Sequence, residues 1–219
     1  MQKFSKKEAL AFGLEITTGN FAFFLGLMAL FVAFSFSVGL VSSYFDQKEI
    51  LIGSLIIFII SVIGGTILEM GILLITFEFY DQKKPQYKDI LIPKHYLLRY
   101  LIAKIAYNIV IFVGFILLII PGIIWSLKYK FVRYLIVDKG MSIKEAFTES
   151  SRITSGSKWN IFWLGLLILF INIVGVLALG VGLLLSVPVS VMAYTYVYRK
   201  LLEGHTSSGE VTVEASGIN

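Results

Sequence analysis

The sequence contains no cysteine and only two histidines among its 219 residues. Without cysteine, neither a disulfide framework nor a thiolate metal site can form. His95 and His205 have no acidic partner at ligand spacing, so we expect no metal site and no cofactor. Nucleophile elbows, phosphate-binding glycine loops and paired-carboxylate motifs are also missing. We therefore expect no catalytic residues, no enzyme activity and no nucleic-acid partner.

Charge is scarce as well, at 15% of residues against 57% hydrophobic, and the mean hydropathy is +0.84. No aspartate, glutamate, lysine, arginine or histidine occurs in residues 21–45, 50–68, 105–127 or 159–198. A membrane-spanning helix needs about 20 apolar residues, and the last run is about twice that length. It should fold back near 180–182, where two glycines favour a turn. The pattern predicts an all-α, polytopic integral membrane protein.

We expect one membrane domain, 1–203, built from helical hairpins. The predicted spans are 21–44, 50–79, 98–120, 122–138, 159–179 and 181–202. Amphipathic helices over 5–19 and 142–156 should lie at the membrane interface. Residues 204–219 are polar and rich in glycine and serine, which predicts a disordered tail.

The basic residues predict the orientation. Clusters of lysine and arginine precede the first span, follow the second, precede the fifth and close the sixth, whereas the loop at 46–49 carries only Lys48. With six spans, all these clusters lie on one side, which the positive-inside rule makes cytoplasmic. Both termini are then cytoplasmic.

The number of spans depends on Pro121 and Gly122. A proline ends a helix and a glycine permits a turn, so we place a break there and let a fourth helix return to the cytoplasm. The alternative is one span ending near Leu127. It leaves five spans and exports the basic residues from Lys128 to Lys158.

The two interfacial helices are predicted to begin and end alike. In each, a serine and a glutamate three residues later match a capping box, and a glycine follows at the same distance as a left-handed stop. These structural positions are Ser5, Glu8 and Gly19 in one copy and Ser142, Glu145 and Gly156 in the other. A similar apolar segment follows each copy, which indicates an internal repeat. The hairpin after 87–99 is a candidate third, diverged copy.

The C-terminal half carries a recognisable order of motifs. They are Pro121-Gly122-Ile123-Ile124-Trp125, then Tyr134-Leu135-Ile136-Val137, then Glu145-Ala146-Phe147 with Ser150, Arg152, Thr154 and Gly156, then a tryptophan and an apolar hairpin. This order resembles the YciC-like bacterial membrane proteins of unknown function and the membrane domain found beside glycerophosphoryl diester phosphodiesterases. The resemblance implies a six-helix protein of the bacterial inner membrane with no established activity. This chain has no catalytic barrel, so we do not carry the hydrolase activity over.

Polar residues inside the apolar runs are the candidate site. They are Glu69, Lys104, Asn108 and Asn172. An ionised group within a span is expensive and is usually paired. Glu69 and Lys104 lie at similar depth on adjacent spans, so we expect them to pair. The pair could be an ion or proton site, or a structural ion pair.

A second candidate is a cytoplasmic pocket for anionic phospholipid head groups. Its basic residues are Lys128, Lys130, Arg133 and Arg152. The same residues also satisfy the charge rule without any ligand.

Three classes of function stay open. The first is a non-enzymatic membrane module that binds lipids or small solutes, or scaffolds other membrane proteins or further copies of itself. The second is an ion-coupled or small-solute transporter that uses Glu69 and Lys104. The third, an embedded enzyme of phospholipid head-group metabolism, lacks a catalytic constellation.

Overall fold

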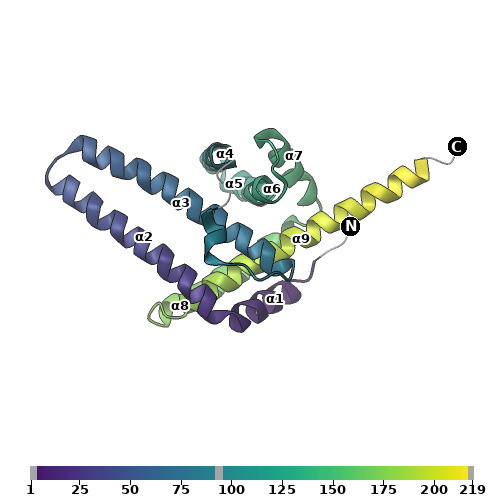
Figure 1. Cartoon of the computed structure of the whole chain (residues 1–219). Helices are drawn as coiled ribbons and strands as arrows, with labels where there is room; N and C mark the ends of the chain where they lie inside the picture. Colours follow the sequence, from purple (N-terminus) through teal and green to yellow (C-terminus); the bar gives the residue numbers. More distant parts are fainter. Residues whose placement is uncertain (1–3, 92–95, 217–219) are drawn as a thin grey trace.

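The computed structural model describes residues 4–91 and 96–216, and these are helical with no strand (Figure 1). Its elements in chain order are α1 (Lys6–Gly19), α2 (Phe21–Gln47), α3 (Leu51–Tyr80), the 3₁₀ helix η1 (Tyr87–Leu91), α4 (Leu97–Leu117), α5 (Ile119–Lys128), α6 (Val132–Lys139), α7 (Ile143–Ile153), α8 (Lys158–Leu177) and α9 (Leu183–Ser216).

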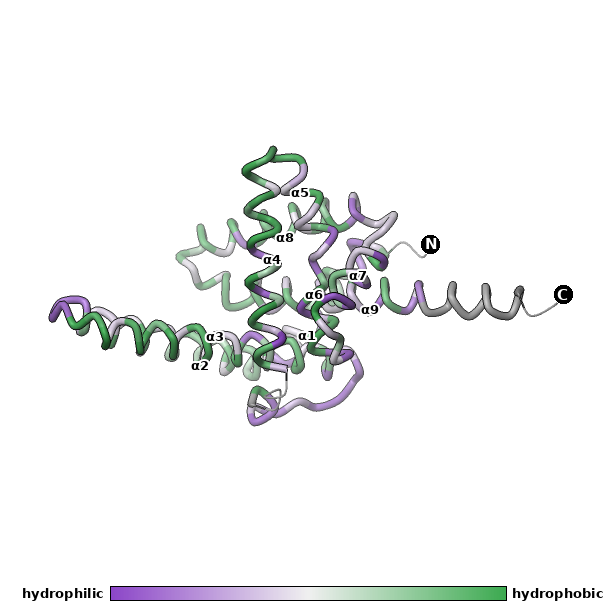
Figure 2. Tube along the Cα trace, turned by 90° about the horizontal axis from the view of Figure 1, so that it is seen from above, coloured by the Kyte–Doolittle hydropathy of each residue, from purple (hydrophilic) through white to green (hydrophobic). Residues whose placement is uncertain are grey.

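Three hairpins, here called arms, leave a common base. The first arm is α2 with α3, the second is α4 with α5, and the third is α8 with the beginning of α9. In Figure 1 the first arm projects to the upper left, whereas α4 is seen nearly end-on. Figure 2, turned by 90°, shows α4 in full length. The arms therefore point in different directions.

The arms are apolar and exposed, and the base, here called the hub, is polar. The hub comprises α1, η1, α6, α7 and the adjoining ends of the arms, where Figure 2 shows most of the hydrophilic residues. Four described helices, α2, α3, α4 and α8, are long and apolar enough to cross a membrane, and at most 22% of their most apolar windows is buried. The chain is thus a helical membrane protein.

The break before Pro121 lies three residues earlier than predicted. The α4 helix ends at Leu117, Leu118 is extended with φ −168° and ψ 152°, and Pro121 is already in the first turn of α5. A proline ring clashes with the carbonyl of the residue four positions earlier, here Leu117, but is tolerated in a first turn. Pro121 therefore ends α4 and is itself part of the first turn of α5.

Gly122 permits close packing and does not form the turn. A Cβ built at Gly114 of α4 would lie 2.9 Å from the Cα of Gly122. The two helices of the second arm therefore touch backbone to backbone, and α5 returns along α4.

The predicted fourth span, 122–138, is wrong as a single helix. The chain turns over residues 129–131 between α5 and α6. The hydroxyls of Ser150 and Thr154 donate to the carbonyl of Lys128 at 3.0 and 3.1 Å, and the N–H of Phe131 donates to Ser150 Oγ at 3.2 Å. Side chains of α7 thus satisfy the backbone groups that the break exposes.

A short helical element precedes each arm, and it packs against the part of a different arm in which the chain returns to the hub. The α1 helix lies along α9, η1 contacts α3, and α7 contacts α6, which follows the returning helix of the second arm. The hub core between them is aromatic. Phe77, Phe131, Tyr134 and Tyr198 pack against one another in edge-on and tilted geometries, with ring centroids 5.4–6.0 Å apart.

The two capping boxes differ. At Ser142 both bonds form, with the N–H of Ser142 donating to Glu145 Oε2 at 2.9 Å and the N–H of Glu145 to Ser142 Oγ at 3.4 Å. At Ser5 only the hydroxyl accepts, from the N–H of Glu8 at 3.3 Å, because the Glu8 carboxylate accepts from Tyr196 instead.

The stop glycines differ too. Gly156 is left-handed as predicted, with φ +78°. Gly19 is not, since it is the last helical residue of α1 and has no positive φ. The chain continues into α2 after Asn20, whose side chain donates to the carbonyl of Ile16 at 3.0 Å, so a left-handed stop is not needed there.

The last helix, α9, continues to Ser216, beyond Glu203 where the predicted tail begins. Residues 217–219 of that tail, and His95, lie outside the described residues.

The complete capping box makes the stability of α7 depend on pH. Hydrogen bonds from the backbone and then the side chain of Ser142 hold the pKa of Glu145 below its ordinary 4.5. A depressed folded pKa means that this contribution is present above about pH 4.5 and is lost as the pH falls through the folded value. Glu145→Gln should therefore melt at a lower temperature than the parent at pH 7 and at a similar temperature at pH 3.

Ser142→Ala is the matched control in these thermal melts. It removes the bond to the Glu145 N–H, whose donor and acceptor do not titrate, so its destabilisation should persist at pH 3. A Glu145→Gln difference of equal size at both pH values would contradict the assignment.

Candidate functional site

One carboxylate at the base of the arms holds two cations from different helices. Glu69 of α3 accepts from Lys104 Nζ of α4 at 2.7 Å through Oε2, and from Arg133 of α6 through Oε1. We call Glu69, Lys104 and Arg133 the ionic cluster. The predicted pairing of Glu69 with Lys104 is present in the structure, and Arg133 is an additional partner.

The ionic cluster is half-buried, since 28–35% of each of its side chains is exposed. Both oxygens of Glu69 are engaged, so the carboxylate is not offered to another cation in this arrangement. Removing one member of such a group leaves an uncompensated charge, which is more destabilising than the group itself is stabilising.

The two asparagines do not join the cluster. Asn108 lies on an exposed face of α4 and forms no hydrogen bond with any described residue. Asn172 of α8 accepts from Ser186 Oγ at 2.7 Å and donates to Ser190 Oγ at 3.2 Å, both on α9. Asn172 therefore links the two helices of the third arm.

The four basic residues predicted for a lipid pocket do not form one pocket. Arg133 belongs to the ionic cluster, and exposed Arg152 makes two hydrogen bonds to Glu149 at 2.8 and 2.9 Å. The Lys128 ammonium lies 5.1 Å from the ring centroid of Tyr129, and that of Lys130 lies 4.0 Å from that of Tyr194. Lys130 lines a cleft between the second and third arms.

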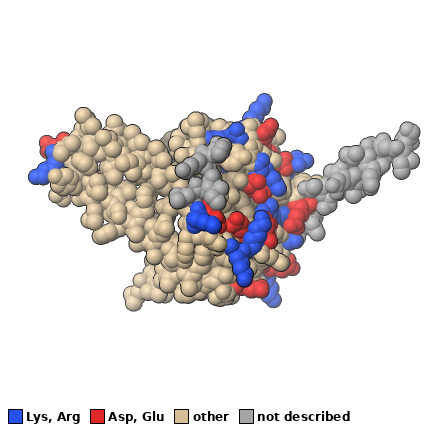
Figure 3. Space-filling model, in the orientation of Figure 1, with Lys and Arg blue, Asp and Glu red and all other residues tan. Residues whose placement is uncertain are grey.

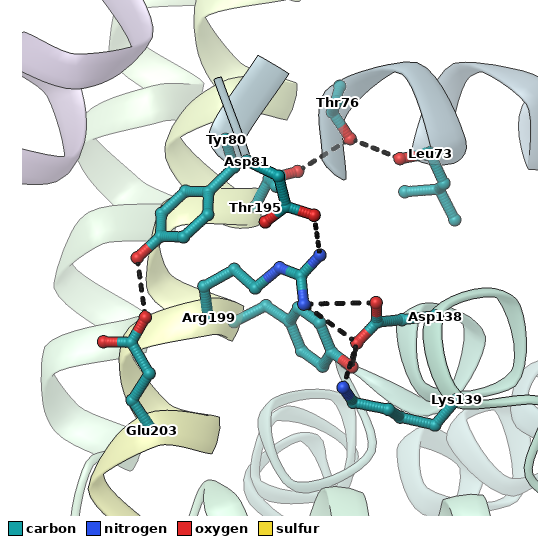
Figure 4. A network of polar contacts seen from close by, with 10 residues as sticks. Leu73, Thr76, Tyr80, Asp81, Asp138, Lys139, Thr195, Arg199 and Glu203 are labelled. Carbon is teal, nitrogen blue, oxygen red and sulfur yellow. Dashed lines mark hydrogen bonds and ion pairs between the residues drawn. The ribbon is translucent and has the colours of Figure 1, made fainter. Parts of the chain in front are cut away.

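A second charged group, which the sequence reasoning missed, joins the first and third arms to α6 (Figure 4). Arg199 of α9 bonds to Asp81 after α3 at 3.0 Å and to Asp138 of α6 at 3.2 Å. Tyr198 donates to Asp138 at 2.8 Å. Arg199 and Asp138 are 13% and 9% exposed, so this ion pair is well shielded. In the sequence these residues only mark helix ends at the interface, and no spacing indicates that they meet.

Threonines at matching places on two arms also meet nearby. Thr195 of α9 donates to Thr76 of α3 at 2.9 Å, and Thr76 donates to the carbonyl of Leu73 at 2.7 Å (Figure 4). Both threonines are fully buried. The bond fixes the height at which the third arm meets the first.

Charged side chains gather over the hub and leave the arms bare, as the space-filling view shows (Figure 3). The exception on this face is the tip of the first arm, where Asp46, Lys48 and Glu49 lie. There, Ser54 donates to Asp46 at 2.6 Å. The first arm thus has a polar tip, whereas residues 115–120 and 177–182, at the tips of the second and third arms, carry no charge.

Comparisons with protein-family models, curated proteins and solved structures found no match for this chain. Within the described residues, no three histidine, aspartate or glutamate side chains gather as a metal-binding group. At this site, basic side chains therefore outnumber acidic ones. Lys104, Arg133 and Lys130 lie at the base of the second arm, and Glu69 is the carboxylate partner of the first two.

Glu69→Gln tests the ionic cluster. The change leaves Lys104 and Arg133 without their shared carboxylate, and we expect a loss on the order of 1–2 kcal/mol, discounted from the buried-pair range because the cluster is half-exposed. Thermal unfolding of the purified protein measures it. Adding Lys104→Met should recover part of the loss by removing one of the two like charges.

Glu78→Gln is the matched control on the same helix, because Glu78 forms no ion pair with any described residue and one of its oxygens is buried without a partner. Glu78→Gln should be neutral or stabilising. Equal losses for Glu69→Gln and Glu78→Gln would mean that the ionic cluster contributes nothing specific.

Proposed function

We propose that the chain is a non-enzymatic module of the bacterial cytoplasmic membrane that binds anionic phospholipids at its hub. The observation that carries the proposal is the surplus of cations where the arms leave the hub. There, Lys104 and Arg133 share the carboxylate of Glu69, and Lys130 lies over the ring of Tyr194 with no carboxylate partner among the described residues. Basic pockets between membrane helices on the cytoplasmic side bind anionic head groups.

The proposed topology has the hub on the cytoplasmic side and three hairpins entering the membrane from it. The basic residues of the hub favour that side by the positive-inside rule. The return of α5 along α4 brings Lys128 to Lys158 back to the side of Arg99, whose guanidinium donates to the carbonyl of Gly140 at 2.6 Å. This supports six crossings over five. Both termini are then cytoplasmic.

The arms also support the interpretation that the chain contains three copies of one structural unit. Each unit is a lead element followed by a hairpin: α1 with the first arm, η1 with the second, and α7 with the third. Each lead contacts the returning side of a different unit, so the three contacts close a ring. Such closure is expected when one unit is repeated and no copy can cover its own face.

A scaffolding role is compatible with this arrangement. The apolar arms leave long exposed faces for lipid, for other membrane proteins or for a second copy of this chain. A transporter that uses Glu69 is less well supported. Its carboxylate is occupied by two cations, and a coupling ion would have to displace one of them.

Single cysteines test the topology cleanly, because the parent chain has none. We expect a membrane-impermeant maleimide added to intact cells to label Gln47→Cys at the tip of the first arm and Leu179→Cys at the tip of the third. Both positions are exposed. Lys144→Cys, exposed on α7, should react only after permeabilisation. Labelling of Lys144→Cys in intact cells would overturn the proposed orientation.

The head-group composition of retained lipid tests the function. After gentle extraction, lipid that stays with the protein should be enriched in anionic species over the bulk extract, and high salt should weaken the enrichment of accessible lipid. Native mass spectrometry with defined mixtures of phosphatidylglycerol and phosphatidylcholine measures this. Retention of both lipids in the ratio supplied would refute the proposed function.

A further inference from the structure

A cleft of about 270 Å³ opens between the second and third arms. Its walls come from α4, α5, α8 and α9, and they include Tyr107, Ser126, Lys130, Gly165, Leu169 and Tyr194. It does not coincide with the ionic cluster, but the two adjoin. The guanidinium of Arg133 lies 5.7 Å from the ring centroid of Tyr107, which also lines the cleft.

Lys130 enters this cleft without a counter-charge. Its ammonium lies 4.0 Å from the ring centroid of Tyr194, and it forms no hydrogen bond or ion pair with any described residue. A cation–π contact is weak compared with the cost of withdrawing an ion from water, so the ring alone does not compensate the lysine. The carboxylate of the adjoining cluster, Glu69, has both oxygens occupied.

The cleft combines the polar groups of Lys130 and two tyrosines with an apolar wall along α8. The α8 helix leaves the hub at Lys158, so Leu169 lies about 16 Å further along the arm, at 1.5 Å per residue. The Tyr194 hydroxyl lies against Gly165, and Leu169, which also lines the cleft, is four residues or about 6 Å further along the arm. A hydroxyl at the level of Gly165 and an apolar side chain beyond it match a lipid that enters from the membrane with its head toward the hub.

A second donor stands beside the lysine. The hydroxyl of Tyr194 has no hydrogen-bond partner among the described residues. Gly165 of α8 leaves room for it, because a Cβ built there would lie 3.2 Å from the hydroxyl oxygen. Gly165 belongs to the apolar segment that the sequence repeats after each interfacial helix, so close approach to Tyr194 gives this glycine a physical role.

We propose that this cleft binds the phosphate of one anionic glycerophospholipid, with the Lys130 ammonium and the Tyr194 hydroxyl on the phosphate oxygens and an acyl chain along Leu166 and Leu169. Lysine is a common point-charge ligand for phosphate. The proposal rests on the proposed function and names its ligand class and its site. A free phosphate ester would offer the same head-group chemistry without the chain.

Native mass spectrometry of the purified full chain with phosphatidylglycerol tests the site. The parent should retain one tightly held lipid, and Lys130→Met should weaken that retention roughly fivefold to tenfold, as expected for one cation near the phosphate layer. Lys128→Met is the matched control. Lys128 is two residues away, faces Tyr129 and is not among the residues that line the cleft.

Gly165→Leu tests the same site without changing any charge. The larger side chain should fill the cleft and displace the lipid while Lys130 is kept. If Lys130→Met fails to fold, Gly165→Leu and Tyr194→Phe still decide the question. Competition with glycerol 3-phosphate, which has the head group and no acyl chain, distinguishes a lipid from a soluble phosphate ester.

The outcomes separate the two proposals. Retention of anionic lipid by the parent, Lys130→Met and Gly165→Leu alike would refute the cleft as the site and leave the proposed function standing. No anionic lipid on the parent would refute the proposed function. Glycerol 3-phosphate binding that Lys130→Met abolishes would then assign the cleft to a soluble phosphate ester, and no such binding would refute the site as well.

Discussion

The arrangement of the whole molecule depends on one carboxylate. Glu69 is shared by Lys104 of α4 and Arg133 of α6, two cations that would repel each other strongly in a low-dielectric surrounding without it. Because the three residues come from three helices, the ion pairs fix where the second arm joins the first and where the chain re-enters the hub. The turn at 129–131 is held between this contact and the hydroxyls of α7.

Much of the architecture could be predicted from the sequence, because long uncharged runs leave few options. The hairpins, the capped helix α7 and the meeting of Glu69 with Lys104 follow from run length, from a local motif and from equal depth on adjacent spans. These features depend on residues close in sequence or on a single shared depth. Features of this kind can be predicted without knowing how the helices pack.

The remaining features depend on packing between distant segments. The two short helices in place of the fourth span require Ser150 to reach the N–H of Phe131, a contact that no local pattern reports. The basic neighbours of Arg133 in the sequence predict a lipid pocket, whereas its partner Glu69 lies 64 residues away on another helix. Arg199 similarly joins Asp81 and Asp138, which in the sequence only mark helix ends. A pattern of charges therefore predicts a side of the membrane for the hub, but it does not predict which charged residues pair.

The contrast between hub and arms has a physical origin. Between membrane helices no hydrophobic force favours contact, because lipid tails are as apolar as leucine side chains. Helices of different arms that share neither closely packed small residues nor polar bonds therefore gain little by packing together. Polar contacts such as those of Arg199 and Thr195 are concentrated at the hub. In the proposed topology, lipid or another protein fills the spaces between the diverging arms. Lys130 lines one of these spaces, and under our proposal its charge selects an anionic occupant.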